Sequence, residues 1–271
     1  MNLSRRLYHT LAAAALLSLL ALAACGSQTS NGETNPPSLP SPTPIPPTNT
    51  PVPTSTPRSF VPPTPPAGAL LGGNIIVNGN AEQGMCALNA STVITPIVGW
   101  TPTGNITPIR YDADGGDLSP TTPGPGDAGN CYFWGGSTGA MSSMTQTDDV
   151  STVAALIDSN IVSYDLSGWL GGYAEQDDNA MLSIQFLGMT GNALGTATIG
   201  PVLAVDRNRT SELVFRSTTG KVPVGTRSIM VTLTMTRTDG SDNDGCADDL
   251  SLYLVQPGGS GSSTPATTPT P

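Results

Sequence analysis

The stretch "TRSIMVTLTMTR", residues 226–237, decides the fold class. Apolar residues stand at every second position: Ile229, Val231, Leu233 and Met235. Threonines fill most of the positions between them. Successive side chains of a β-strand point to opposite faces, so this period of two predicts a strand with one face in a core. The stretch "NAMLSIQFLG", residues 179–188, repeats the pattern.

Three more segments have the composition of strands: "IVSYDLSGWLGGY" (161–173), "SELVFRS" (211–217) and "LSLYLV" (250–255). Turn-forming stretches such as "GMTGNALG" and "GKVPVGTR" separate them. A helix of one or two turns is expected only in "STVAALIDSN", residues 151–160. Many short strands with turns at even intervals favour an all-β sandwich over alternating strands and helices.

The N-terminus has the pattern of an export signal. Arg5 and Arg6 precede an apolar stretch, Leu11 to Ala24, which is too short for an ordinary membrane span. It ends in "LAAC" at Cys25, which resembles the lipobox of bacterial lipoproteins. That resemblance implies cleavage before Cys25, lipidation of its thiol, and a protein of the bacterial cell envelope, anchored by lipid on the outer side of a membrane. A plain secretory signal with a chance cysteine is the alternative.

Composition divides the rest of the chain into three parts. Residues 25–67 are dominated by Pro, Thr and Ser and predict a disordered tether, because proline fixes φ and removes hydrogen-bond donors. Residues 257–271 have the same composition and are expected to be disordered as well. Residues 68–256, following a signal at 1–24, are long enough for one globular domain.

Charge and histidine content exclude several function classes. Loss of Arg5 and Arg6 with the signal leaves 8 basic residues against 20 acidic ones, a net charge of −12. Such a surface argues against nucleic acid as a partner. The single histidine, His9, lies in the signal, so the mature chain has no histidine for a catalytic triad or a zinc site. Paired carboxylates are the main catalytic option left, and no sequence feature singles out such a pair.

Both ends of the predicted domain carry recognisable motifs: "NIIVNGNAEQG" at residues 74–84, "GW" at 99–100, and "ADDLSLYL" at 247–254. Together they resemble galactose-binding-like jelly rolls, and carbohydrate-binding modules in particular. The resemblance implies a jelly-roll fold and one structural Ca²⁺ where the first and last strands meet, held by Glu82 and by Asp248, Asp249 or both. Ala81 departs from the family pattern, which usually has Phe there.

The alternation of Leu250, Leu252 and Leu254 places Asp248 on the core side of its strand and Asp249 on the outer side. Carboxylates suit calcium, which prefers hard oxygen ligands. The alternative is a solvated turn, the usual role of an Asp- and Gly-rich run. "DNDG" at 242–245 and "DADGGD" at 112–117 are expected to be acidic loops rather than further ion sites.

Exposed aromatic side chains would indicate sugar binding, because pyranose rings stack on them. Trp134, Tyr132 and Tyr173 are the candidate ligand-binding residues, while Trp169 is expected to pack in the sandwich and Trp100 in the core. The predicted function is a non-catalytic module for an extracellular glycan. A module that binds a surface protein is the alternative, and a carboxylate-dependent glycosidase is a third possibility.

Three cysteines remain after lipidation of Cys25, so one internal disulfide and one free thiol are expected. If Glu82 and the closing aspartates share an ion, Cys86 and Cys246 lie near the same strand pair. We therefore predict a Cys86–Cys246 disulfide with Cys131 free. Cys86–Cys131 is the competing pairing.

Overall fold

The structure is a computed structural model that describes residues 64–256 and residue 258 of the 271-residue chain. The signal peptide, Cys25, most of the tether and nearly all of the tail lie outside the described residues, so the predictions for them remain predictions. Within residues 64–256, no helix is long and apolar enough to cross a membrane.

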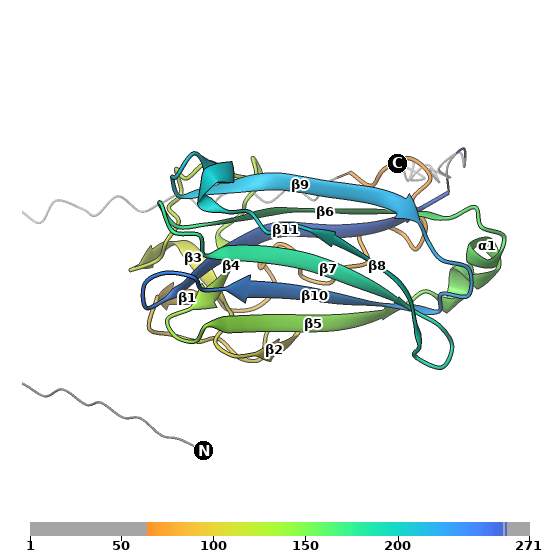
Figure 1. The fold of residues 1–271 in the computed structure, drawn as a ribbon, viewed down its shortest axis with the longest axis horizontal. Coiled ribbons are helices and arrows are strands. Elements are labelled where there is room, and N and C mark those ends of the chain that lie inside the picture. Colours follow the sequence, from red (N-terminus) through yellow and green to blue (C-terminus); the bar gives the residue numbers. More distant parts are fainter. Residues whose placement is uncertain (1–63, 257, 259–271) are drawn as a thin grey trace, which may run out of the picture. The chain divides into compact units, whose positions relative to one another are not determined.

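Two β-sheets make up the described domain (Figure 1). Sheet A has six strands in the order β1 (Ala87–Asn89), β3 (Thr107–Asp114), β4 (Cys131–Gly136), β11 (Asn243–Val255), β6 (Ser163–Gly172) and β9 (Glu212–Lys221). Sheet B has five strands in the order β2 (Thr101–Thr103), β5 (Met141–Asp149), β10 (Ser228–Thr236), β7 (Asn179–Leu187) and β8 (Ala193–Ile199). The predicted all-β sandwich is therefore confirmed.

The strand order defines a jelly roll. From β4 onward, strands in one sheet are followed in the chain by strands of the other, except that β7 and β8 are consecutive in sheet B. The result is the order β4-β11-β6-β9 facing β5-β10-β7-β8, with antiparallel pairing throughout these eight strands. Eight strands connected as two Greek keys form the jelly-roll topology.

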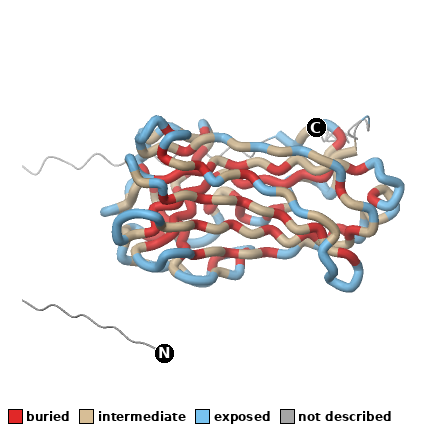
Figure 2. The backbone as a smooth tube through the Cα atoms, viewed as in Figure 1, coloured by how far each residue is buried: buried red, intermediate tan, exposed pale blue. Residues whose placement is uncertain are grey.

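Alternating burial explains why these segments are strands. Along β10 every second residue is buried, namely Ile229, Val231, Leu233 and Met235, and the residues between them are partly exposed. β7 repeats this alternation beside it (Figure 2). The apolar faces of both sheets meet in the main core, which includes Trp100. The expected helical turns form as a 3₁₀ turn at Ser151–Val153 and α1 at Ala154–Asp158.

The outer face of sheet B is a hydroxyl surface whose strand residues are uncharged except for Asp149 at the end of β5. Outward positions of β10 and β7 carry only Ser, Thr, Met, Asn, Gln and Leu. One row of hydroxyl residues crosses all five strands through paired positions: Thr101, Thr145, Thr232, Ser183 and Thr198. Threonine suits a half-solvated strand because its branched side chain packs on the pleat while its hydroxyl faces water.

The opening motif does not form a strand. Residues 74–84 make a series of turns, and this segment lies beside the second half of β11. The Ile75 amide donates to the Leu252 carbonyl, and the Leu250 amide donates to the Gly79 carbonyl. Ala81, where the family usually has Phe, is buried with a positive φ of 59°. The expected end-to-end contact is present, but through a turn-rich segment instead of a paired first strand.

A β-bulge in β11 overturns the predicted orientation of the closing aspartates. Asp248 pairs with Trp169 and Ser251 pairs with Ser167, so the register shifts between them. Asp249, inside the bulge, has a φ of 47°. One extra residue reverses the alternation upstream. Asp248 therefore lies on the outer face of sheet A and not on the core side, as counting back from the leucines had predicted.

A second apolar cluster lies on that outer face. It joins sheet residues, including Tyr111, Tyr132 and Trp134, to Leu118 and Ala128 from the β3–β4 connection. This connection, residues 115–130, has no helix or strand and is called the strap below. The outer face of sheet A is thus covered at one end, because only a buried face can accept so many apolar side chains.

The disulfide joins Cys86 to Cys131, with Cα atoms 6.3 Å apart, and Cys246 is a buried free thiol. The predicted Cys86–Cys246 pairing is therefore wrong, and its competitor forms. Glu82 explains the geometry: its carboxylate accepts the amide of Cys131, which brings the segment that holds Cys86 to the start of β4. Cys246 faces outward beneath the strap and pairs across strands with Trp134.

Candidate functional site

Glu82 connects the opening motif to the end of the strap. Its Oε1 accepts hydrogen bonds from the amides of Asn130, at 2.7 Å, and Cys131, at 2.8 Å. Gly129 provides the space for this carboxylate, since its φ is +64° and a Cβ there would lie 2.4 Å from Oε1. These bonds join Glu82 to the start of β4 in the middle of the chain, and its predicted link to the closing aspartates through a shared ion remains a prediction.

Asp127 and Asp249 form a carboxyl pair beside Glu82. Burial raises the pKa of Asp249 to about 7, with further contributions from the charge of Asp127, a hydrogen bond with it, and the charge of Glu82. Asp127 lies in the strap and was not among the sequence candidates. Only its surroundings, the small residues of "GDAG" at 126–129, could have suggested a loop ligand. Three carboxylates therefore gather around the bulge of β11.

Asp248 has a different environment from Asp249. It is fully buried, its Oδ2 accepts the Tyr111 hydroxyl at 2.7 Å, and its Oδ1 accepts the amide of Asp249 at 2.8 Å. Burial, and then the charge of Asp249, raise the pKa of Asp248 well above its usual range. Both carboxylate oxygens are occupied within the protein, so Asp248 acts as a structural group on the outer face.

Within residues 64–256, no three His, Cys, Asp or Glu side chains are arranged closely enough to hold a metal ion as they stand. Glu82, Asp127 and Asp249 nevertheless supply hard oxygens of the kind that calcium prefers. Burial, and then the neighbouring charges of Asp127 and Glu82, disfavour the charged form of Asp249 and raise its pKa. The donor chemistry suits a cation, and the calcium prediction remains a prediction.

A second carboxyl pair joins the other end of the strap to β11. Asp117 and Asp244 are hydrogen-bonded to each other, and the indole N–H of Trp134 donates to Asp117 Oδ2 at 2.6 Å. Burial and the charge of Asp244 raise the pKa of Asp117 to about 8. Asp244, the second residue of β11, is buried and its backbone amide donates to the buried Asp178 carboxylate. "DNDG" is therefore not a loop, contrary to prediction, because Asn243 and Asp244 are buried strand residues.

The aromatic residues are arranged differently from the prediction. Trp134 and Tyr132 are buried under the strap, at 1% and 0% exposure, and cannot serve as exposed stacking surfaces there. Tyr173, one residue beyond β6, is exposed, and its ligand role remains a prediction. Trp169, expected to pack in the sandwich, lies on the outer face of sheet A and is partly exposed.

Trp169 and Phe215 form an aromatic pair on this face. Their rings meet edge to face with centroids 5.6 Å apart, and Phe215 is 49% exposed. The next positions along the strands bring Ser167, Ser217 and Ser251 into one row, with a 2.7 Å hydrogen bond between the hydroxyls of Ser167 and Ser251. We call this set the platform: Asp165, Ser167, Trp169, Phe215, Ser217 and Ser251.

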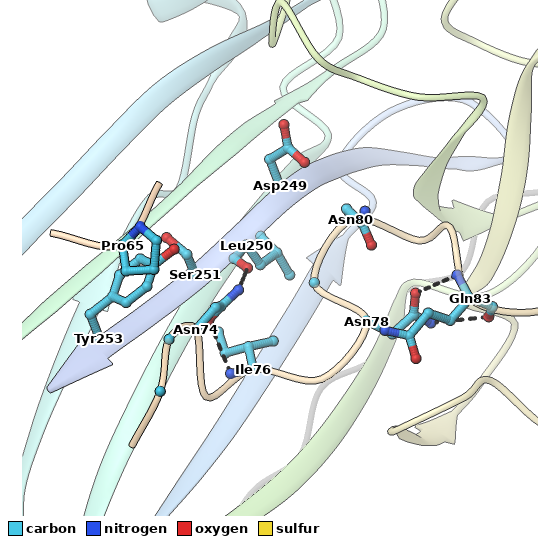
Figure 3. A pocket seen from close by; sticks show the side chains of 13 residues that line it. Pro65, Asn74, Ile76, Asn78, Asn80, Gln83, Asp249, Leu250, Ser251 and Tyr253 are labelled. Atoms are coloured by element: carbon cyan, nitrogen blue, oxygen red, sulfur yellow. Dashed lines mark hydrogen bonds between the residues drawn. The ribbon is translucent and has the colours of Figure 1, made fainter. Parts of the chain in front are cut away.

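A polar pocket of about 340 Å³ adjoins the platform at Ser251 (Figure 3). Two asparagines in its wall hold the backbone through their side-chain amides. Asn74 donates to the Leu250 carbonyl, and Asn78 donates to the Val98 carbonyl. Asp249 comes from β11 and Asn80 from the turn-rich opening segment beside it (Figure 3). The pocket is therefore lined both by Asp249 of the bulge and by Ser251 of the platform.

No protein-family model and no curated protein sequence matches the chain. Among solved structures, a family 16 carbohydrate-binding module ("Family 16 Carbohydrate Binding Module-2") matches 66% of this chain and 99% of its own, with 19% identity and a TM-score of 0.40. The CBM22-1 xylan-binding domain from Paenibacillus barcinonensis Xyn10C matches 64% of this chain and 99% of its own, with 14% identity and a TM-score of 0.33.

A third structure, the enzymatically active domain of tailspike protein 4 from bacteriophage CBA120, matches 67% of this chain with 17% identity and a TM-score of 0.39. The match spans only 21% of that chain. By the order of its strands, the described part of this chain is a jelly-roll β-sandwich, and carbohydrate-binding modules are among the proteins to which it is similar.

Proposed function

We propose that the chain is a surface-displayed bacterial lipoprotein whose jelly roll is a non-catalytic carbohydrate-binding module. The observation that carries this proposal is the platform on sheet A. It combines a partly exposed Trp169–Phe215 pair with a row of serine hydroxyls on the adjoining strands. The predicted ligand class is therefore kept, while its location changes from Trp134 and Tyr132 to Trp169 and Phe215.

Both parts of the platform suit a sugar. Aromatic rings bind the apolar face of a pyranose, and hydroxyl groups can donate to and accept from its hydroxyls. Trp169 is only partly buried, so part of its side chain is accessible to a ligand. Asp165 adds a carboxylate acceptor at the far end of the same face.

A glycan array probed with the intact chain tests the ligand class. Removing either aromatic face should weaken binding to the best-scoring polysaccharide by about tenfold, equivalent to about 1.4 kcal/mol. Trp169→Ala and Phe215→Ala provide this test, and Thr232→Ala on the outer face of sheet B is the matched control. Unchanged binding in both aromatic variants, with melting temperatures like the wild type, would contradict the platform.

A protein-binding surface module is the second candidate function. The broad outer face of sheet B favours it, because its strand residues, Asp149 apart, lack the charges that keep most sheet surfaces solvated. An array without any bound glycan, together with loss of cell-surface association in Thr145→Lys or Thr232→Lys, would favour this candidate over carbohydrate binding.

Surface display depends on Cys25 in this proposal. Two or more acyl chains give stable anchoring, whereas an unlipidated chain has no comparable membrane affinity. Cys25→Ser should remove the mass of the lipid and shift the protein from the detergent phase to the aqueous phase, or leave the signal uncut. A variant that partitions and weighs as the wild type does would refute lipidation.

A structural calcium ion at Glu82, Asp127 and Asp249 completes the proposal. When bound, the ion would offset the repulsion between these carboxylates and join the opening motif, the strap and the bulge of β11. Asp248 is left out because it is fully buried, where it accepts the Tyr111 hydroxyl.

Chelation measures this site through stability. An ion that binds only the folded state at a hundredfold excess over its dissociation constant adds about 2.7 kcal/mol. Chelator should therefore lower the melting temperature of the wild type, and Asp249→Asn should remove the calcium-dependent difference. Asp165→Asn, distant from the bulge, is the control. Identical melting curves of the wild type with calcium and with chelator would exclude the site.

A further inference from the structure

The strap covers a direct continuation of the platform. Trp169 pairs with Phe215, and two residues further along these strands Gly171 pairs with Leu213. Gly171 also pairs with Cys246, which pairs with Trp134. Adjacent rows on one face of a sheet are about 6.7 Å apart, so the covered row and the exposed row form one surface.

Aromatic groups are concentrated in the covered part. Tyr111 and Tyr132 have ring centroids 4.8 Å apart, and Trp134 lies beside them on the same face. The surface beneath the strap thus has more aromatic area than the exposed platform. If it were uncovered, an aromatic strip would extend from Phe215 to Trp134.

Few buried side chains hold the strap in place. Only Leu118, Pro125, Ala128 and Gly129 of its residues are buried, and all but Leu118 are small or cyclic. Its backbone contacts with sheet A include the Leu213 amide donating to the Pro123 carbonyl and the Leu118 amide donating to the Tyr132 hydroxyl. A segment with so little buried area and no strand pairing opens at a lower cost than the strands beneath it.

The Asp117–Asp244 contact fastens one end of the strap. Two carboxyl groups can share a hydrogen bond only while one of them keeps a proton, since two carboxylates repel. The indole N–H of Trp134 donates to Asp117 Oδ2 at 2.6 Å, so Asp117 also holds the largest aromatic residue of the covered row. Opening the strap would release Trp134 from this bond.

We propose that the strap is a cover that opens when the Asp117–Asp244 contact breaks, and that the uncovered Tyr132–Trp134 surface then binds further units of a glycan chain seated on the platform. This inference deepens the proposed function: it assigns long, chain-like glycans to the open form and short ones to the closed form. Trp134 and Tyr132 would therefore contact ligand only in the open form.

The groups around this contact favour opening as pH rises. Asp242 and Asp178 add negative charge next to Asp244. Asp117 faces the thiol of Cys246 and the phenol of Tyr132. The positive charge of Arg207 lies near Cys246 and Asp178. Burial raises the pKa of Asp117 to about 8 and that of Asp244 to about 6. The proton that stabilises the closed form is thus present at low pH and is lost as pH rises through about 8.

Hydrogen exchange of the intact chain without any ligand tests the opening step. With intrinsic rates corrected, protection of the amides in residues 117–128 should fall by roughly tenfold per pH unit between pH 5 and pH 8, because closing takes up about one proton. Asp117→Asn should flatten this dependence, since its amide can donate to Asp244 without a shared proton. Asp112→Asn is the control. Protection that is independent of pH in the wild type would overturn the cover.

Binding of oligosaccharides of two lengths tests what the uncovered surface does. The probes are hexasaccharides and disaccharides of β-1,4-linked xylose, glucose and mannose at pH 5.5 and pH 8. The wild type should gain affinity for one hexasaccharide at pH 8 by about tenfold, and Asp117→Asn and Trp134→Phe should lose this gain while their disaccharide binding stays unchanged.

The two experiments separate the inference from the proposed function. An equal preference for the hexasaccharide at both pH values, in the wild type and in Asp117→Asn, overturns the concealed surface and leaves the platform standing. Absence of binding by all probes refutes the glycan assignment of both surfaces, and the exchange result then decides the opening step by itself.

Discussion

At the scale of single residues, Gly129 is the clearest constraint in the domain. Its φ of +64° favours glycine, and a Cβ there would lie 2.4 Å from Glu82 Oε1. Gly129→Ala should displace Glu82 from the amides of Asn130 and Cys131 and lower the free energy of unfolding by about 2–3 kcal/mol.

Urea unfolding measures this loss, with Gly126→Ala as the matched control in the same strap. A Cβ on Gly126 meets no atom within 4 Å, so that variant should change stability by less than about 1 kcal/mol. Equal unfolding midpoints for the two variants would show that Glu82 does not depend on the glycine.

At the scale of elements, the strands were predictable and the exceptions to their pattern were not. Alternation identified the cores of β6, β7, β9, β10 and β11, because one buried face forces a period of two. The bulge at Asp249 adds one residue without any change in composition, so counting from Leu250 placed Asp248 on the wrong face.

The strap escaped prediction for a related reason. Its residues, "GGDLSPTTPGPGDAGN", have the composition of an ordinary loop, and only tertiary contacts show that it covers Trp134 and Tyr132. Glu82 was identified from its motif, whereas Asp127 and Phe215 depend on which strands become neighbours. Local pattern predicts which residues face one side of a strand, and topology decides what lies opposite.

The disulfide also links two elements, because it connects the residue before β1 to the first residue of β4. Peptide mapping without reduction should recover a linked Cys86–Cys131 fragment, with Cys246 alkylated only after unfolding. Removal of this disulfide, which closes a loop of 45 residues, should cost about 2–4 kcal/mol. Cys246→Ala is the control for loss of a thiol, and a linked Cys246 peptide would contradict the structure.

At the scale of the whole molecule, an acidic chain places several carboxyl groups where burial disfavours their charge. Burial raises the pKa of Asp148 to about 6, and the pKa of Asp244 and Asp117 to about 6 and about 8. A carboxyl whose folded pKa is raised stabilises the fold fully below its unfolded value, near 3.8, and this contribution is lost as pH rises through the folded value. The fold should therefore lose stability between pH 4 and pH 8.

Asp148 offers the sharpest test of this sign, because it lies outside the strap and the calcium residues, and its buried Oδ2 has no hydrogen-bond partner in the described part of the chain. Asp148→Asn should leave the urea midpoint unchanged near pH 4 and raise the free energy of unfolding at pH 8 by about 1 kcal/mol, once solvent screening is allowed for. Its neighbour Asp149 is the control: hydrogen bonds from Ser151 lower the pKa of Asp149, so Asp149→Asn should not stabilise at pH 8. Measurements at a constant chelator concentration keep calcium out of the comparison. A urea midpoint at pH 8 that is lower for Asp148→Asn than for the wild type would mean that the buried charge is favourable.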